Sequence, residues 1–468
     1  MKKLFFTGGC LLLAVFSYAQ TIAQQLQKAF EQFESAPQLK HATSSLYVTE
    51  ANTGKVVFDK NSQVGLAPAS TQKIITSVTA FELLGKEFRY KTDLGYDGNI
   101  KDGILNGRLI IAGSGDPTLG SWRYKNTIDS VILEKWTDAV TISGIKGFES
   151  IVVDEKNNSI QTIPDGWIWQ DVGNYYGAGS GGLNWRENQY DIILSSGESI
   201  GSKVNIEATI PEYFKRQPFY NELKAAEKGT GDNAYNYLHQ GYSFLSGTIP
   251  RGEKNFKISA AMAEPAKYVT SEFSRMLGTK NIRSNWNPTA LDNVGEMPKR
   301  KTYEYTVLTS HYSPSLDSIV YWFLKKSINL YGEALIKTFA YESTGFGSTD
   351  SGVAIVKKFW EQKGLDEDEL NIRDGSGLSP LNRVTTHAQV EILKYAKTKD
   401  WFLYFYDALP EYNGMKMKSG TISDAKAFCG YQKSKDGKEY IFSFIVNNYN
   451  GPSSGVVNKM YKVLDLLK

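Results

Sequence analysis

The stretch LAPASTQKIITSVTAFELLGKEFRYKTDL, residues 66–94, carries the strongest local signal in this chain of 468 residues. Pro68 and Ala69 precede a serine, and Ile74, Val78 and Phe81 then recur at the spacing of one helix face. A glycine follows where this pattern stops, as is common at helix C-termini. The stretch therefore predicts a helix that opens at residue 70 and buries its apolar side.

Ser70 and Lys73 lie three positions apart at the start of this helix, so their side chains share a face. A serine hydroxyl is a poor nucleophile until a base takes its proton. Lysine, with an ordinary pKa of about 10.4, is a poor base at neutral pH, but partial burial and a second cation such as Lys418 would lower its pKa. We therefore predict Ser70 as a nucleophile and Lys73 as its base.

A second motif, Ser327-Ile328-Asn329, follows the apolar run SIVYWFLKK at 318–326. The end of a helix here would point the Ser327 hydroxyl into a cleft. In acyl transfer of this kind Ser327 relays a proton to the leaving amine, and we expect Asn329 to hydrogen-bond the substrate backbone.

A third motif, Lys418-Ser419-Gly420, ends the alternating segment MKMK at 415–418, which is typical of a strand. Lys418 and a hydroxyl at Ser419 or Thr421 are suited to hold a terminal carboxylate. The backbone N–H groups of Ser70 and Thr421 would form an oxyanion hole. The order of the three motifs matches that of a known set in serine enzymes that form acyl-enzymes.

By these motifs, the chain resembles the low-molecular-mass penicillin-binding proteins. Within them it resembles the D-alanyl-D-alanine carboxypeptidase/endopeptidase family that has a large insertion between the first and second motifs. The resemblance rests on residues 66–94 and on five further stretches, which occur in the family's order and span nearly the whole chain. These are GDPTL at 115–119, GWIW at 166–169, LKKSIN at 324–329, DGSGLSPLN at 374–382 and MKSGT at 417–421.

The resemblance implies an α/β fold: a transpeptidase/β-lactamase-like domain, with an antiparallel sheet flanked by helices, interrupted by a mostly β inserted region. It implies hydrolysis of peptidoglycan peptides that end in D-Ala-D-Ala, and covalent inhibition by β-lactams. It also implies that Leu378, in DGSGLS, shapes a side-chain pocket. The middle residue of the second motif is Ile328, where relatives often carry aspartate.

The change in residue pattern along the chain predicts its division into domains. Residues 1–19 have the charged start, short apolar run and Ser-Tyr-Ala ending of a signal peptide, so we expect a secreted, periplasmic or cell-envelope-associated protein. Residues 20–91 and 262–468 are expected to form the transpeptidase-like domain. The β-rich region 92–261, with little helix, is expected to form two small nested domains.

Composition excludes some function classes and leaves others open. The 53 basic and 50 acidic residues nearly balance, which argues against a nucleic-acid partner. No cysteine cluster or HExxH motif suggests a metal site, and we expect no cofactor. The sequence does not decide the oligomeric state.

Two alternatives to the peptidase remain at this point. Glu367 opens EDELN at 367–371, which resembles the segment whose glutamate activates the deacylating water in class A β-lactamases. A wall-binding module that has lost catalysis is the other. The GPSSG segment at 451–455 matches a nucleophile elbow, but the last histidine is His387, before that serine, so we interpret the segment as a turn.

Overall fold

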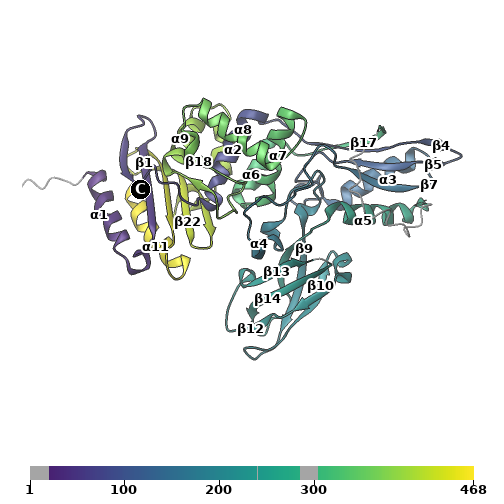
Figure 1. Cartoon of the computed structure of the whole chain (residues 1–468), viewed down its shortest axis with the longest axis horizontal. Helices are drawn as coiled ribbons and strands as arrows, with labels where there is room; N and C mark the ends of the chain where they lie inside the picture. The colour runs from purple at the N-terminus through teal and green to yellow at the C-terminus, as the bar shows by residue number, and fades with distance from the viewer. Residues whose placement is uncertain (1–20, 240, 285–303) are drawn as a thin grey trace, which may run out of the picture.

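The computed structural model describes residues 21–239, 241–284 and 304–468, and the predicted signal peptide at 1–19 lies outside them. Figure 1 shows a helix-flanked sheet that contains both the first and the last strand of the chain, with a second, extended region beside it. The two regions meet where the 3-10 turn Tyr175–Gly177, which follows α4 (Trp169–Val172), contacts α7 (Asn329–Thr344).

The main sheet has six strands in the order β2-β1-β23-β22-β21-β20, and each neighbouring pair is antiparallel. Strands from both ends of the sequence are thus neighbours, which places residues near 45 and 445 side by side. The strands are β1 (Thr43–Glu50), β2 (Val56–Lys60), β20 (Glu411–Tyr412), β21 (Met415–Ile422), β22 (Ala425–Lys433) and β23 (Glu439–Asn447).

Helices cover both faces of this sheet. Helices α1 (Ile22–Glu34) and α11 (Ser453–Leu464) pack on one face, where Phe30, Phe444 and Met460 belong to one buried cluster. A larger cluster on the other face holds the remaining helices of the domain. These are α2 (Lys73–Leu84), α6 (Leu316–Lys325), α7, α8 (Thr349–Gln362), α9 (Thr386–Lys397) and α10 (Phe402–Ala408).

Helix α2 is the centre of this domain, because every residue from Lys73 to Phe81 is buried. The predicted helix is therefore present, and Gly85 caps its C-terminus with a φ of 78°. Its first residues differ from the prediction, because a short 3-10 turn, Ala69–Gln72, precedes the α-helix. The predicted fold class, an antiparallel sheet flanked by helices with an inserted region, is confirmed.

The inserted region contains two groups of strands. The first combines the sheet β17-β3-β6-β8 with the small sheet β16-β7-β5-β4. Helices α3 and α5 pack on it. Its elements are β3 (Lys91–Tyr96), β4 (Asn99–Lys101), β5 (Ile104–Asn106), β6 (Arg108–Ala112), α3 (Asp129–Ile142), β7 (Gly147–Phe148), β8 (Ser150–Asp154), α5 (Pro265–Thr279), β16 (Arg283–Ser284) and β17 (Thr306–Tyr312).

The second group lies below the first in Figure 1 and joins the sheets β10-β9-β15 and β11-β14-β12, with β13 paired to β14. Buried residues of both groups, such as Leu109 and Leu245, belong to one continuous cluster. The strands are β9 (Gln189–Ser196), β10 (Val204–Ile210), β11 (Phe219–Asn221), β12 (Lys224–Ala226), β13 (Ala234–His239), β14 (Tyr242–Pro250) and β15 (Phe256–Ala261).

The inserted region extends past the predicted boundary at residue 261. Strand β17 pairs antiparallel with β3, and Val269 and Phe273 of α5 belong to the core of the inserted region. By packing, α5, β16 and β17 therefore belong to this region, which also contains the helix α3 within the part of the chain expected to have little helix. The residues that return to β3 are far from it in sequence, so local periodicity carries no sign of the pairing.

Candidate active site

Ser70 lies in the 3-10 turn that leads into α2, half-buried at the wall of a cavity of about 560 Å³. Ala69 before it has a φ of 45°, a left-handed conformation that side chains rarely adopt and that is often found at functional sites. Strand β21 lies against this turn: a Cβ atom on Gly420 would be 2.9 Å from the Ser70 nitrogen and 2.6 Å from the Pro68 oxygen. A glycine at 420 is therefore what allows the third motif to approach the first.

Lys73 is fully buried, and its Nζ lies 2.9 Å from Ser70 Oγ. The same Nζ lies 2.6 Å from Asn329 Oδ1 and 2.7 Å from the Ser376 carbonyl oxygen. Burial lowers the Lys73 pKa to about 7, against the opposing effect of the carboxylates of Asp374 and Glu333. A neutral amine in this position donates to the two acceptors and offers its lone pair to the Ser70 hydroxyl.

The second motif occupies a break between two helices, in agreement with the helix end expected at Ser327. Helix α6 ends at Lys325, Ser327 has a φ of 56°, and α7 begins at Asn329. The left-handed Ser327 turns the chain and leaves its half-buried side chain at the wall of the cavity. Ile328 packs against the main core of the domain, which accounts for an apolar residue in the middle of the motif.

Asn329 differs in its contacts from our expectation that it holds the substrate. Its Oδ1 accepts a hydrogen bond from Lys73, and its Nδ2 donates to the Tyr176 carbonyl oxygen at 2.7 Å. Tyr176 belongs to the inserted region, so Asn329 connects that region directly to Lys73. The side-chain amide thus orients the lysine in this structure.

The third motif brings a second buried lysine to the site. Lys418 Nζ donates to the Ser419 carbonyl oxygen at 2.7 Å. Burial, together with the charges of Lys73 and Lys426, holds the Lys418 pKa well below its usual range. Thr421 is exposed and lines the cavity, and its Oγ1 accepts a hydrogen bond from Lys426 at 2.6 Å. Ser419 is half-buried and is not among the residues that line the cavity.

The DGSGLS segment forms a buried turn beneath Lys73. The Asp374 carboxylate accepts from the Trp167 indole at 2.9 Å and from the backbone of Gly377 and Ser379 at 2.8 and 2.7 Å. Leu378 from the same turn lines the cavity. The sequence alone did not predict that Asp374 holds this turn together, because partners such as Trp167 come from distant parts of the chain.

The inserted region forms one wall of the cavity. Asp171, Tyr175 and Tyr176 contribute from the segment around α4, and Tyr235 contributes from β13. Burial raises the pKa of Asp171 to about 6, against a hydrogen bond with Tyr176 that lowers it. The signal for this wall in the sequence is the dense Trp and Tyr content of 166–185, in which Trp185 is buried and Tyr175 is exposed.

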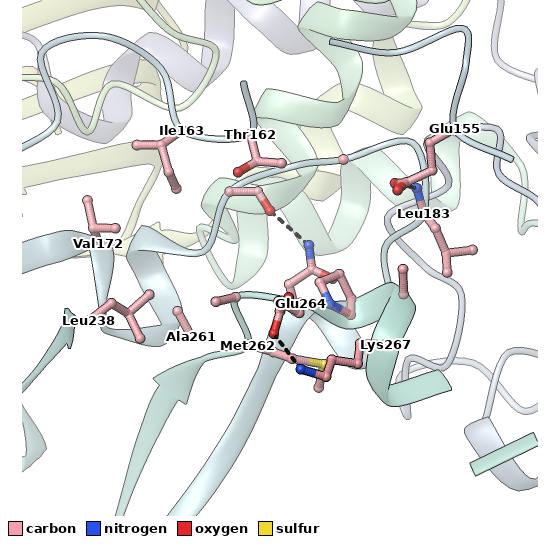
Figure 2. A pocket seen from close by; sticks show the side chains of 16 residues that line it. Glu155, Thr162, Ile163, Val172, Leu183, Leu238, Ala261, Met262, Glu264 and Lys267 are labelled. Carbon is pink, nitrogen blue, oxygen red and sulfur yellow. Dashed lines mark hydrogen bonds and ion pairs between the residues drawn. The ribbon is translucent and has the colours of Figure 1, made fainter. Parts of the chain in front are cut away.

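A separate cavity of about 370 Å³ lies within the inserted region, between the start of α5 and the 155–183 segment (Figure 2). Glu264 and Lys267 form an ion pair of 3.4 Å at its edge. It contains no residue of the three motifs, so it is distinct from the cavity at Ser70.

Of the two look-alike motifs, EDELN at 367–371 lies away from the cavity at Ser70, whereas Gly451 and Ser453 of GPSSG line it. Glu367 is in an exposed 3-10 turn, 4.0 Å from Lys357, and does not line the cavity at Ser70, so its position does not suit activation of water there. Gly451 has a φ of 74° and α11 starts at Ser453, which confirms a turn in the GPSSG segment.

A buried lysine against a serine hydroxyl, on this fold, defines a serine acyl-transfer enzyme of the transpeptidase/β-lactamase-like class. A model of the D-Ala-D-Ala carboxypeptidase 3 (S13) family matches residues 24–411. The chain belongs to this family, and it is a serine-type D-Ala-D-Ala carboxypeptidase.

Individual relatives are distant but cover most of the chain. The D-alanyl-D-alanine carboxypeptidase of an Actinomadura species is 24% identical, over 92% of this chain and 82% of its own length. The D-alanyl-D-alanine carboxypeptidase DacB of Haemophilus influenzae is 23% identical, over 85% of this chain and 84% of its own length. The crystal structure of penicillin binding protein 4 from H. influenzae has the same fold, with a TM-score of 0.78 at 21% identity, over 95% of this chain and 99% of that one.

Two further properties, concerning membrane spans and metal ligands, hold for the residues that the structure describes. No helix in them has the length and apolarity needed to cross a membrane. They also bring together no group of three or more His, Cys, Asp or Glu side chains that could hold a metal ion.

Proposed function

We propose that Ser70 attacks the carbonyl carbon of the penultimate D-alanine of a peptidoglycan stem peptide and forms an acyl-enzyme. The observation that carries this proposal is the 2.9 Å contact between Lys73 Nζ and Ser70 Oγ at the wall of the main cavity. Lys73 takes the hydroxyl proton as the C–O bond forms. Water then hydrolyses the ester and restores the Ser70 hydroxyl.

The other motif residues complete the cycle. The N–H groups of Ser70 and Thr421 stabilise the negative charge that develops on the carbonyl oxygen. Ser327 relays the proton held by Lys73 to the nitrogen of the departing D-alanine as the peptide bond breaks, so Lys73 returns to its neutral form. Asn329 orients Lys73, a role supported by its two hydrogen bonds, and we retain for it the hydrogen bond to the substrate backbone because it also lines the cavity.

The substrate carboxylate is held at the third motif. Lys418 supplies the positive charge, and of the two expected hydroxyl donors we assign the role to Thr421, which lines the cavity, rather than to Ser419, which does not. A carboxylate next to Lys418 favours the protonated amine, so we expect substrate binding to raise the lowered pKa of Lys418. Leu378 contacts the side chain of the substrate from the opposite wall.

The substrates we propose are stem peptides ending in D-Ala-D-Ala and the peptide cross-links between them, with β-lactams as covalent inhibitors. Stem peptides ending in D-Ala-D-Ala are supported by the names of the relatives, which are D-alanyl-D-alanine carboxypeptidases. Inhibition by β-lactams is supported by the penicillin binding protein 4 of H. influenzae, which has been crystallised with a β-lactam. Residues 1–19 would direct the protein to the periplasm or the cell envelope, where these substrates occur.

Product analysis tests this function. Purified protein, incubated with a pentapeptide ending in D-Ala-D-Ala and with intact peptidoglycan, should release D-alanine from the first and convert cross-linked muropeptides of the second to monomers. Release of D-alanine without loss of cross-links would restrict the activity to that of a carboxypeptidase. Failure on both substrates, by a protein that is folded, would contradict the proposal.

The reaction should depend on pH through Lys73. Only the neutral amine accepts the Ser70 proton, and burial places the Lys73 pKa at about 7. Acylation by penicillin should therefore be slow in acid, rise as the pH passes through about 7, and level off above it. A rate constant that is already maximal near pH 5 would show that Lys73 is not the group that titrates.

A further inference from the structure

Glu333 is a fully buried acid next to the catalytic lysine, and the proposed mechanism gives it no role. It lies one helical turn after Asn329 on α7 and has no exposed surface. Its two carboxyl oxygens share one backbone donor, the N–H of Gly375, at 3.2 and 3.1 Å, and the Ser376 hydroxyl is its other hydrogen-bond partner. A buried acid costs a great deal of free energy when ionised, unless several donors or a cation compensate it.

The neighbouring Asp374 has quite different surroundings. Its two oxygens accept hydrogen bonds from five N–H groups, which suit an ionised carboxylate, an acceptor only. The donors are Gln72 Nε2 at 3.0 Å, Gly377 N at 2.8 Å, Asn382 Nδ2 at 3.0 Å, Trp167 Nε1 at 2.9 Å and Ser379 N at 2.7 Å. Of the two buried acids, Asp374 is therefore the one built to carry the negative charge.

The charged groups around Glu333 act in both directions, since Asp374 favours its neutral form whereas Lys73 and Lys337 favour its ionised form. Among the described residues, those that interact with it electrostatically are Asp374 from the turn, Lys73 from α2 and Lys337 further along α7. Lys337 is held by the carbonyl oxygens of Gln161 and Ser180, at 2.7 and 2.6 Å. Burial and the Asp374 charge raise the pKa of Glu333 to about 8, although Lys73 opposes this.

Glu333 also fixes the position of an atom that contacts Lys73. It binds the N–H of Gly375, and the carbonyl of the next residue, Ser376, lies 2.7 Å from Lys73 Nζ. The turn lies directly on α7, since a Cβ atom on Gly375 would be 2.3 Å from the Gly332 oxygen. A displacement of Gly375 would therefore move the Ser376 carbonyl away from the lysine.

We propose that Glu333 is a positioning residue for Lys73: as a neutral acid it ties the 374–377 turn to α7, and it leaves the lysine beside one carboxylate charge rather than two. This inference rests on the proposed function of Lys73 as the base. A second carboxylate charge near Lys73 would favour its protonated form, which cannot accept the Ser70 proton.

Two substitutions distinguish the effect of the turn's position on activity from the effect of a charge on Glu333. Glu333→Gln is permanently neutral and retains an oxygen for the Gly375 N–H, whereas Glu333→Ala retains neither. Glu342→Gln, which replaces an exposed acid on the same helix, is the matched control. For each variant we would measure the rate constant of acylation by a fluorescent penicillin as a function of pH, together with the thermal unfolding midpoint.

The Gln variant should keep an acylation rate constant within about threefold of wild type, and its acid limb should keep its midpoint within about 0.3 pH units. The Ala variant should lose about tenfold or more, because the lysine loses a fixed acceptor. The control should match wild type in both respects.

Three results would overturn the inference. A folded Glu333→Gln protein that is inactive would show that the negative charge is required. An acid limb moved down by about one pH unit or more would show that Glu333 is ionised beside Lys73 in the wild type. A Glu333→Ala protein as active as wild type would show that the contact with Gly375 does not matter. Failure of the proposed function itself would be recognised differently, because the wild type would not be labelled at all.

Discussion

Replacing Lys73 with methionine will lower the rate constant of acylation by penicillin by about 10³-fold or more. Methionine has a similar length and suits a buried site, so the change removes the amine with little change in volume. Without the amine, Ser70 Oγ loses its hydrogen-bond partner at 2.9 Å, and no other side chain in the described part of the chain is bonded to it to take its proton. Stopped-flow fluorescence with a labelled penicillin measures the effect.

A second variant distinguishes a base from a cation at this position. Lys73→Arg keeps a positive charge but does not lose a proton at accessible pH, so we expect it to be as slow as the methionine variant. Lys86→Met is the control, because Lys86 follows α2 and contacts the Tyr404 ring, away from the cavity. An arginine variant that is acylated at the wild-type rate would exclude the role of Lys73 as a base.

Lys418→Ala will lower the rate constant of acylation by about 10² to 10³-fold, because a buried charged partner of the substrate carboxylate is lost. Lys416→Ala is the matched control on the same strand, since Lys416 Nζ lies 5.6 Å from the Tyr406 ring centroid and does not line the cavity. We expect that variant to stay within about twofold of wild type, because Lys416 is half-buried and its amine faces the Tyr406 ring. Penicillin and a D-Ala-D-Ala pentapeptide should respond alike, because both present a carboxylate.

Equal losses in the Lys416 and Lys418 variants would contradict this assignment, since they would indicate a general effect of positive charge on β21. A Lys418 variant that loses activity only through unfolding would be recognised from its thermal midpoint. With both variants folded, the difference between them measures the contribution of the carboxylate contact.

The sequence predicted the elements of this site that depend on local order. Ser70 and Lys73 lie one helical turn apart, and this spacing alone places the amine against the hydroxyl. The alternation of MKMK predicted a strand that carries Lys418. These features follow from the geometry of one helix or one strand, so they could be predicted without knowledge of the fold.

The supporting residues could not be predicted in this way. Glu333 stands in a helix where a charged side chain is ordinarily exposed, and only the packing of the 374–377 turn on α7 buries it. Asn329 was expected at the substrate, but the Tyr176 carbonyl that binds it comes from a segment 153 residues away. The return of β17 to β3 is equally non-local and leaves no periodic signal.

The break at Ser327 shows a further limit. The helix end was expected here, yet the left-handed turn, with Ser327 at a φ of 56°, was not. No glycine or proline marks the turn. The strain is tolerated because Ile328 and the flanking helices are packed into the core.

The central claim, that Ser70 is the acylated nucleophile, is tested most directly by mass spectrometry of the protein after reaction with penicillin. Trypsin should release the peptide 61–73, which contains Ser70. We expect one added penicillin per chain, located on Ser70 within that peptide, and no addition to the Ser70→Ala variant. The absence of an adduct on the folded wild type, or an adduct that persists in Ser70→Ala, would contradict it.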